Sequence, residues 1–365
     1  MPCRRSARLF LIVLSKKEAK TPLASVAESC YNAPILFKRQ KEVFEMKKIL
    51  SLVIALVLVF SFAAVSSASA ELTFTTGGTS GTYYAFGSVL AQYISNNSDV
   101  KVTAVAGNGS ADNIDKLDLG AAQLGFVQND VAYYAYNGIR FEQYIGMPVD
   151  SFTALCALYN ETVQLITCNP DIKSVEDLRG KNVSIGSSGS GVYFNAMDFF
   201  AAYGMTEEDI VPQYLSFGDS AEALKDGKID AAFVVASAPT PAVTDLCTTK
   251  GAYLISLDEE HVAKLKEISG AYTECVIPAG TYEGVDEDVT TVAVKATIIA
   301  NGKVSDEEAY TIVSTIFENK DEIAGLHAKG AELDLEYASE CGLPYHPGAA
   351  KYFAEKGLTV TTADK

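Results

Sequence analysis

Two glycine- and serine-rich segments, residues 77–81 (GGTSG) and 186–191 (GSSGSG), occupy equivalent places in two similar stretches of this chain. Each follows a short segment of strand-forming residues and precedes a segment with helical spacing. Glycine allows the tight turn that such a connection needs. A strand, a glycine-rich turn and a helix that occur twice in this order predict two α/β units with mostly parallel strands.

The strands and helices of both units can be placed from the pattern of apolar residues. The first unit is predicted to contain strands at 72–76, 101–106 and 124–128, with helices at 83–95 and 111–119. The second is predicted to begin with a short capped helix at 174–178 and to continue with strands at 182–186, 213–216 and 231–236 and helices at 192–203 and 220–227. Both units therefore read as βαβαβ.

Two segments are candidates for carrying the chain between the units. Residues 152–168 are rich in strand formers, and residues 272–278 are a second candidate crossing. Residues 289–299 read as strand or helix, and residues 306–330 as one long helix. If the chain crosses out and back, residues 71–160 with 278–365 form lobe 1, and residues 161–277 form lobe 2. That topology predicts a cleft between two lobes joined by a hinge of two strands.

The segment before residue 71 has the pattern of a leader. Residues 46–70 contain Met46, two lysines, an apolar run and a small-residue cleavage site that ends at Ala70. We expect a signal peptide that is cleaved after Ala70 and a periplasmic protein; a retained membrane anchor is the alternative. Because a signal peptide acts at the start of a chain, residues 1–45 are expected to be a non-native N-terminal extension.

The charge balance restricts the partners. The chain has 46 acidic and 29 basic residues, a net charge of −17, and residues 1–70 hold 11 of the basic residues but 4 of the acidic ones. Binding to nucleic acid needs a basic face, so it is not expected. Only two arginines, Arg140 and Arg179, follow residue 70. An anionic ligand must therefore be held largely by neutral groups.

Cysteine and histidine patterns give no metal site. Five cysteines follow residue 70, namely Cys156, Cys168, Cys247, Cys275 and Cys341. An odd number leaves at least one thiol unpaired, and the sequence leaves open whether the others form disulfides or are buried thiols. Cys-x-x-Cys and His-x-x-x-His spacings are absent, so we expect no metal and no cofactor.

The two glycine-rich turns are candidate anion sites. The first amides of a helix lack intrahelical partners, and the helix dipole favours negative charge there. Neither turn matches a nucleotide-binding motif, so neutral amides and hydroxyls remain, which suit a carboxylate. The alternative is that each turn is only a tight connection. From these turns we predict the ligand-binding residues Gly78, Thr79, Ser80, Ser188 and Ser190.

Polar residues also follow the second and third predicted strands. Asn108 and Ser110 come after the second strand, and Gln128 and Asn129 end the third. Strand ends in open α/β sheets face the ligand crevice, so all four are predicted to bind ligand. Ser110 has a second interpretation as a simple helix cap.

Three further residues are predicted near the cleft. Tyr83 and Tyr193 lie in the first turns of the helices behind the glycine-rich turns, where each ring either walls the pocket or packs in a lobe core. Pro239, in the segment 238–241 (APTP), fits a rigid loop at the cleft mouth or a plain helix start.

Several blocks together resemble a known family, the TAXI family of solute receptors of TRAP transporters. The likeness covers nearly all of residues 72–357, and its blocks are residues 75–84 (TTGGTSGTYY), 109–113 with 128–130, 174–181, 186–191, 238–241 and 343–352. The resemblance implies an α/β fold, that of a two-lobed periplasmic binding protein of the type II-like kind, with a cleft between the lobes and a two-strand hinge.

The resemblance also implies a function. It implies a monomeric receptor that captures a small organic anion, a dicarboxylate or an acidic amino acid such as glutamate or 2-oxoglutarate, and delivers it to the membrane subunits of a TRAP permease. Neither arginine stands where a carboxylate-gripping arginine is expected, in agreement with an amide-based site. A periplasmic ligand sensor and an enzyme on the same fold are the alternatives. No enzyme is expected, because His261, His327 and His346 all fall late, away from the serine-rich turns.

Overall fold

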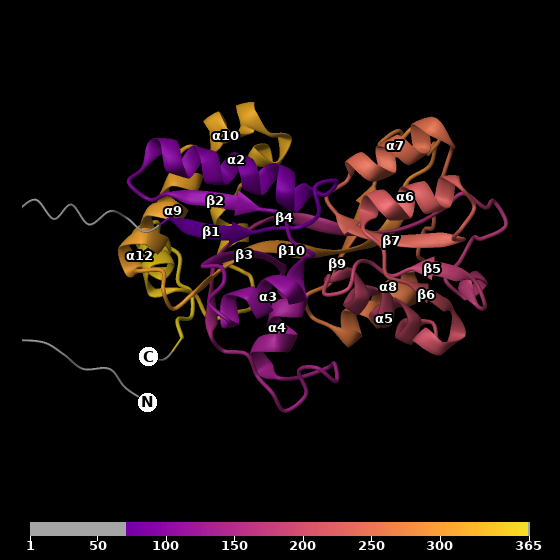
Figure 1. Ribbon diagram of the computed structural model, residues 1–365, viewed down its shortest axis with the longest axis horizontal. Helices are drawn as coiled ribbons and strands as arrows, with labels where there is room; N and C mark the ends of the chain where they lie inside the picture. The colour runs from indigo at the N-terminus through magenta and orange to yellow at the C-terminus, as the bar shows by residue number, and fades with distance from the viewer. Residues whose placement is uncertain (1–70, 364–365) are drawn as a thin grey trace, which may run out of the picture. The chain divides into compact units, whose positions relative to one another are not determined.

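Ten strands join into one sheet in the part of the chain that the structure, a computed structural model, describes, which is residues 71–363. The strand order is β2-β1-β3-β10-β4-β7-β5-β6, with β8 beside β4 and β9 beside β10 (Figure 1). The signal peptide predicted at 46–70 and the extension before it lie outside the described residues.

The first lobe is built around three parallel strands, β1 (Leu72–Thr75), β2 (Val102–Val105) and β3 (Leu124–Gln128). Helices α2 (Thr82–Asn97), α3 (Ser110–Asp118) and α4 (Asn129–Asn137) follow these strands in turn. The apolar spacing explains α2, since Phe86, Leu90 and Ile94 recur every four residues and are all buried. The elements predicted for residues 72–128 are confirmed to within two residues.

The second lobe repeats this arrangement. Strands β5 (Asn182–Ser184), β6 (Val211–Gln213) and β7 (Ala231–Ala236) are parallel, and α5 (Val192–Ala202) and α6 (Phe217–Lys225) follow β5 and β6. The order β6-β5-β7 matches β2-β1-β3, so β1 corresponds to β5 and β2 to β6. The strand predicted at 213–216 is displaced, because pairing with β5 uses residues 211–213.

Two long strands pass through both lobes. Strand β4 (Phe152–Thr167) pairs with β10 (Val289–Asn301) along residues 152–162 and with β7 along residues 162–167. Strand β10 pairs with β9 (Thr273–Ile277) through residues 289–293 and with β3 through residues 296–300. The return passage is therefore made by β10. Residues 272–278, the candidate crossing, form β9 within the second lobe because β9 pairs only with the first part of β10.

The remaining elements cover the sheet. They are η1 (Glu176–Leu178), η2 (Glu207–Asp209), α7 (Pro241–Thr249), β8 (Tyr253–Leu254), α8 (Glu259–Ile268), α9 (Asp306–Glu318), α10 (Lys320–Leu326), η3 (Ala328–Glu332), α11 (Leu335–Ala338) and α12 (Pro347–Glu355). The single long helix predicted at 306–330 is wrong. Nearly half of it, residues 319–330, lies beyond α9 in separate short helices, since α9 ends at Asn319, which has φ −119°.

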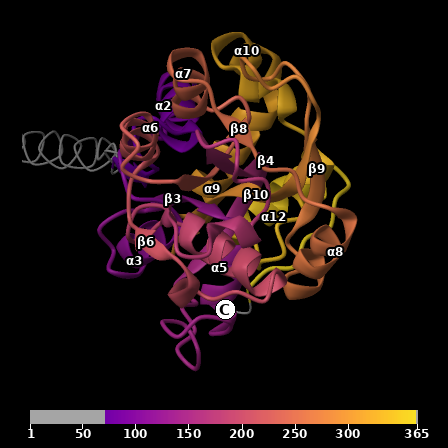
Figure 2. The ribbon, with the colours of Figure 1, turned by 90° about the vertical axis from the view of Figure 1, so that its right-hand side faces the viewer.

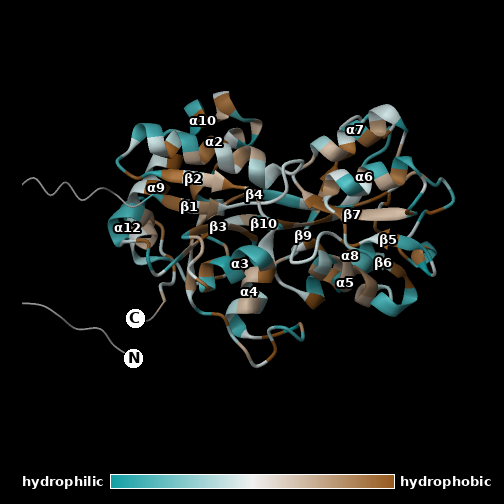
Figure 3. Cartoon of the chain, viewed as in Figure 1, coloured by the Kyte–Doolittle hydropathy of each residue, from teal (hydrophilic) through white to brown (hydrophobic). Residues whose placement is uncertain are grey.

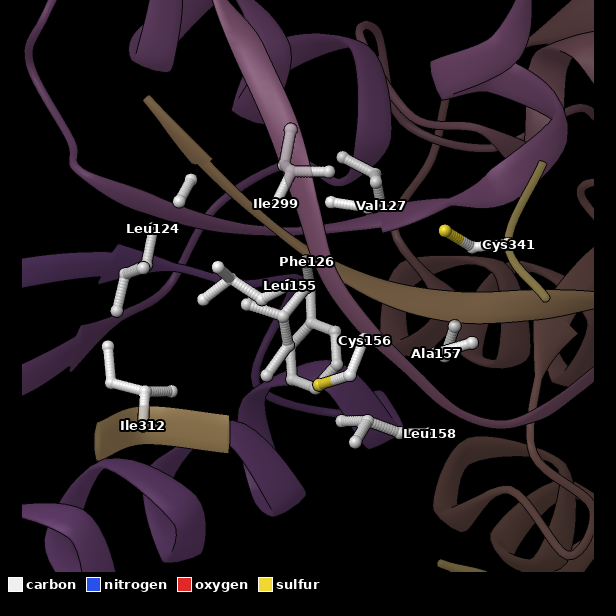
Figure 4. Close-up of a cluster of buried hydrophobic side chains, with 14 of the residues drawn as sticks. Leu124, Phe126, Val127, Leu155, Cys156, Ala157, Leu158, Ile299, Ile312 and Cys341 are labelled. Carbon is white, nitrogen blue, oxygen red and sulfur yellow. The ribbon is translucent and has the colours of Figure 1, made fainter. Parts of the chain in front are cut away.

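Apolar side chains fill the space on both faces of the sheet. In the first lobe one cluster includes Phe86 with Phe126 and Ile312, and Figure 4 labels the last two. In the second lobe, separate clusters lie under α5 with α8 and under α6 with α7. Helices α5 and α7 lie on opposite sides of the strands in both views (Figures 1 and 2). Figure 3 shows hydrophilic residues on the outward turns of helices such as α12.

All five cysteines of the described part of the chain are free thiols. Cys156 and Cys341 are buried in the core of the first lobe (Figure 4). Burial raises the pKa of Cys156, and it raises the pKa of Cys341 to about 11. Cys247 is buried as well, whereas Cys168 and Cys275 are only partly buried.

Candidate functional site

Four helix N-termini meet at one cavity between the lobes. Helices α2 and α3 follow β1 and β2, and helices α5 and α6 follow β5 and β6. The first residues of these helices, Thr82, Ser110, Val192 and Phe217, all line the cavity. Each N-terminus offers amide groups without intrahelical partners and the positive end of a helix dipole. Their convergence makes this cavity suited to an anion.

The cavity is small, and the described residues that line it include no basic side chain. Its volume is about 60 Å³. That is room for roughly five water-sized groups. Lysine and arginine are absent from the described residues that line it, which are Gly77, Gly78, Ser80, Gly81, Thr82, Tyr83, Asn108, Gly109, Ser110, Gln128, Glu161, Ser187, Ser190, Gly191, Val192, Ser216, Phe217, Val235 and Ala236.

The first lobe contributes a glycine-rich loop and a tyrosine. Gly78 and Ser80 line the cavity from the loop that connects β1 to α2. Tyr83, in the first turn of α2, stacks on Phe126 with ring centroids 4.6 Å apart and also lines the cavity. Tyr83 therefore meets both descriptions that the sequence left open, because its ring packs on Phe126 in the core and the residue also lines the cavity.

The Tyr83 hydroxyl donates a hydrogen bond to Oε2 of Glu161. Glu161 lies on β4 just before this strand changes partner from β10 to β7, and it is 2% exposed. Burial raises the pKa of the Glu161 carboxyl well above its ordinary value, and the hydrogen bond from Tyr83 offsets only part of this. The cavity therefore contains one acidic group that burial favours in its neutral form.

The loop between β2 and α3 is fixed by a polar pair. The Ser110 hydroxyl accepts a hydrogen bond from the Gln128 backbone N–H at 3.0 Å. Ser110 is thus tied to the end of β3, and Asn108 beside it is exposed at the cavity edge, with its N–H bonded to Asp112 Oδ2 at 3.0 Å. The Gln128 side chain continues across to the second lobe, where its Nε2 donates to Asn195 Oδ1 at 2.6 Å.

The loop before α5 packs tightly on the first lobe. A Cβ on Gly191 would lie 1.3 Å from Gln128 Oε1 and 2.7 Å from Ser110 Oγ. Asp112 N donates to Gly189 O across the same contact at 2.9 Å. Only a glycine at position 191 leaves space for Gln128 and Ser110, so the glycines of this loop allow the two lobes to close on each other.

A buried polar network also joins the lobes beside the cavity. Asp198 on α5 is fully buried and accepts hydrogen bonds from Arg140 Nε at 3.1 Å and from Tyr272 OH at 2.9 Å. Burial raises the pKa of Asp198, and Arg140 counteracts this rise. The guanidinium of Arg140 therefore pairs with Asp198 at the contact between the lobes, and Arg140 does not line the cavity.

Asp130 belongs to the same network. Its Oδ2 accepts from Asn195 Nδ2 at 2.8 Å, and its Oδ1 is buried without a hydrogen-bond partner within residues 71–363. Burial, together with the smaller effect of the nearby Asp198, raises the pKa of Asp130 to about 7. The contact between the lobes thus includes a carboxyl group that titrates near neutral pH.

The structure brings together seven of the twelve predicted site residues at the cavity, namely Gly78, Ser80, Tyr83, Asn108, Ser110, Gln128 and Ser190.

The other five predicted residues lie outside the lining. Thr79 is exposed, and Asn129 uses its Oδ1 to accept from Lys295 N at 2.7 Å. Ser188 and Tyr193 border a neighbouring surface hollow, where the Tyr193 hydroxyl donates to Glu207 at 3.2 Å. Pro239 is exposed beyond the end of β7 and precedes Thr240, the N-cap of α7. The plain helix-start interpretation of this segment therefore fits its position.

Sequence reasoning missed the cavity residues Glu161, Ser187, Ser216, Phe217, Val235 and Ala236. A signal existed for Ser216 and Phe217, because β6 and α6 repeat β2 and α3, so the start of α6 corresponds to Ser110. Glu161 stood out as the acidic residue within the apolar run 152–168. The contribution of Val235 and Ala236 follows only from the pairing of β7 with β4.

The described residues hold no group of three or more histidine, cysteine or acidic side chains that could bind a metal ion. Within the same residues, each helix is too short or too polar to cross a bilayer.

The fold and the cavity define the class of this protein. Two α/β lobes, a cleft between them and two connecting strands make the two-lobed fold of periplasmic binding proteins. Residues 74–357 match the NMT1-like family, and the chain belongs to this family. It is accordingly a solute-binding protein.

Solved structures are similar at low sequence identity. The periplasmic aliphatic sulphonate binding protein SsuA from Escherichia coli is 16% identical, with 78% of each chain covered and a TM-score of 0.42. The GluR0 ligand-binding core from Nostoc punctiforme, in complex with L-glutamate, is 14% identical, with 72% of this chain and 100% of that chain covered and a TM-score of 0.43.

Proposed function

We propose that this protein is an exported receptor that captures a small carboxylate between its lobes and delivers it to a membrane permease. The observation that carries the proposal is the convergence of four helix N-termini on one small cavity without a lysine or arginine in its described lining. A carboxylate fits this donor set, because it accepts several amide hydrogen bonds at once and is stabilised by the helix dipoles.

The proposed ligand-binding residues are the seven predicted ones at the cavity together with the start of α6. Ser80 and Ser190 line the cavity from opposite lobes, and Ser216 adds a third hydroxyl. The Ser216 hydroxyl accepts from Asp219 N at 3.2 Å as an N-cap, which leaves the first amides of α6 for the ligand.

The proposed partner is the membrane part of a TRAP permease. Its support is the ordered set of sequence blocks that resembles TAXI receptors, which includes residues 75–84 and 186–191. Both of these blocks border the cavity. Reconstitution with a candidate permease in vesicles tests this part: ligand uptake that depends on the receptor supports it, and uptake by an ATP-driven permease instead would overturn it.

Titration calorimetry with a panel of small organic acids, including glutamate and 2-oxoglutarate, tests ligand capture. We expect one site per chain and no product formation. Ser80→Trp and Ser190→Trp are expected to abolish binding because both side chains line the cavity. Ser188→Trp is the matched control, since Ser188 is exposed in the same loop. Full affinity in both cavity variants would disprove the proposed site.

A further inference from the structure

A surface hollow of about 220 Å³ lies beside the ligand cavity, and both lobes contribute to it. It shares Ser187 and Ser190 with the lining of the cavity, so it borders the same loop. Its other walls include Ala111 and Gln143 from the first lobe and Tyr193, Phe194 and Tyr214 from the second. Because the walls come from both lobes, the hollow has this shape only while the lobes are closed on each other.

The residues around the hollow favour a cation. The hydroxyls of Tyr193 and Tyr214 both donate to the Glu207 carboxylate, at 3.2 and 2.5 Å. Lysine and arginine are absent from the described residues that line the hollow. A lysine or arginine side chain is attracted to the face of an aromatic ring, and a nearby carboxylate adds to this attraction. The hollow therefore suits a guanidinium or ammonium group.

Residues 139–147, which follow α4, join the hollow to an exposed apolar patch. Gln143 of this segment lines the hollow. Ile139, Ile145 and Met147, which we call the apolar patch, are 40%, 60% and 59% exposed, and Figure 1 shows the chain projecting beyond α4 here. The buried centre of a protein–protein interface is typically apolar and poor in charged residues. The apolar patch and the hollow together thus have the composition of one side of such an interface.

The second lobe holds this segment in place. Phe141 and Tyr144 pack on Phe194 of α5, with ring centroids 4.6 and 5.9 Å apart. Arg140 Nε donates to Asp198 of α5 at 3.1 Å. Opening of the lobes would move α5 away from these side chains, and it would also divide the hollow. A partner that binds both the hollow and the apolar patch therefore distinguishes the closed form from the open form.

On the basis of the proposed function, we propose that the hollow and the apolar patch form the surface on which the closed receptor docks on its permease. An arginine or lysine side chain of the permease enters the hollow, and an apolar part of the permease covers the patch. The loop shared with the cavity places the docked permease next to the bound solute. The net charge of −17 opposes the two other occupants, a second copy of the chain and a bilayer of anionic lipid.

Receptor-dependent uptake into vesicles that contain the permease measures docking. Tyr214→Ala removes a ring of the hollow, and Ile145→Asp places a charge in the apolar patch. Each is expected to lower uptake at least about tenfold at limiting receptor concentration, while calorimetry shows unchanged ligand affinity. The matched controls are Tyr253→Ala on β8, with Tyr253 49% and Tyr214 51% exposed, and Leu326→Asp on α10, with Leu326 and Ile145 both 60% exposed.

The hollow can also be tested without the permease. The probe is N-acetylarginine amide, and N-acetylcitrulline amide is its uncharged match. With an organic acid bound to the intact receptor, NMR is expected to show saturable shifts of the amide resonances of residues 187–190 for the arginine compound alone. Tyr214→Phe keeps the ring and should bind equally, whereas Tyr214→Ala should bind about threefold more weakly. Binding should also be weaker without the organic acid, because the lobes are then free to open.

The outcomes separate this docking surface from the proposed function. Normal uptake with Tyr214→Ala and Ile145→Asp would overturn the docking surface and leave the proposed function standing. Equal binding of the two amides, or no binding of either, would overturn the cation-binding hollow. Dimerisation, or flotation with phosphatidylglycerol vesicles, that Ile145→Asp abolishes would assign the apolar patch to a second copy or to lipid and so overturn the proposal. Absence of uptake with the unmodified receptor would instead refute delivery to a permease, and the docking surface with it.

Discussion

The two glycine-rich loops look alike in sequence but have different surroundings. In the loop before α2, a Cβ on Gly78 would meet no atom within 4 Å, and one on Gly81 would make ordinary contact with Phe217 at 3.4 Å. In the loop before α5, Gly186 and Gly189 have φ of +87° and +81°, and Gly191 has no room for a Cβ. The first loop has room for a Cβ at Gly78 and at Gly81, whereas the second has none at Gly191, where it packs against the opposite lobe.

The same glycine-rich pattern therefore has a different structural role in each of the two loops. The glycines of the first loop leave open space beside Gly78. The glycines of the second loop also let the second lobe approach Ser110 and Gln128 at backbone distance. Substitutions in the second loop should therefore disturb closure of the lobes, and equivalent substitutions in the first loop should not.

The largest effect is expected from Gly191→Ala. Its φ of −66° suits alanine, so the cost comes from the clashes of the added Cβ with Gln128 Oε1 at 1.3 Å and with Ser110 Oγ at 2.7 Å. Overpacking of this kind costs up to about 3 kcal/mol, which corresponds to roughly a 100-fold loss of ligand affinity. Calorimetry measures the affinity, and small-angle scattering should show the lobes further apart. Gly78→Ala is the control in the first loop, and an equal loss in both variants would erase the difference between the loops.

A smaller effect is expected from Arg140→Gln. This change removes the cation beside the buried Asp198 while leaving the cavity lining intact. We expect ligand affinity to fall about tenfold, since closure would then leave Asp198 without its charged partner. Arg179→Gln is the matched control, because Arg179 pairs with Asp209 on the surface of the second lobe. A fall of the same size in the control would refute a special role for Arg140.

Asp130 should make stability depend on pH. Its pKa is raised from 3.8 to about 7, so the native state holds a proton that the unfolded state has lost between these values. The contribution of Asp130 to stability is therefore fully present below about pH 4 and is lost as the pH rises through 7. Asp130→Asn should remove a decline of about 1.4 kcal/mol per pH unit from the free energy of unfolding. Urea titrations from pH 4 to 8 measure the free energy of unfolding of both proteins. The same dependence on pH in both proteins would contradict this role of Asp130.

The smallest effect is expected from Ser188→Ala. Ser188 is exposed and lies outside the cavity lining, although its neighbours Ser187 and Ser190 line the cavity. Ligand affinity should change by less than about twofold, as is usual for surface substitutions. Titration calorimetry measures this affinity. A fivefold loss would mean that the whole second loop contacts the ligand.

Much of the fold could be predicted from the sequence because its signals are local. The apolar spacing of Phe86, Leu90 and Ile94 indicates α2 directly, and strand β7 was placed to the residue. The break at Asn319 was missed because apolar residues keep a helical spacing on both sides of it. The return passage was missed because it depends on which strand pairs with β10, a contact between distant residues.

Part of the site could be predicted because its signals, too, are local in the sequence. Ser110 and Gln128 follow strands, so their position at the sheet edge could be inferred from topology. Glu161 and Phe217 reach the cavity only through the pairing of β4 and the packing of the second lobe. Ser188 and Ser190 differ in their burial, yet two serines of one short loop cannot be told apart by composition.

The shared strands β4 and β10 also bear on how the molecule melts. Because each of them supplies main-chain hydrogen bonds to both lobes, neither lobe can unfold while the other keeps a complete sheet. Heat should therefore unfold residues 71–363 in a single cooperative transition. A solute held at the four helix N-termini would then raise the melting temperature of the whole unit by mass action, including elements as distant from it as α12.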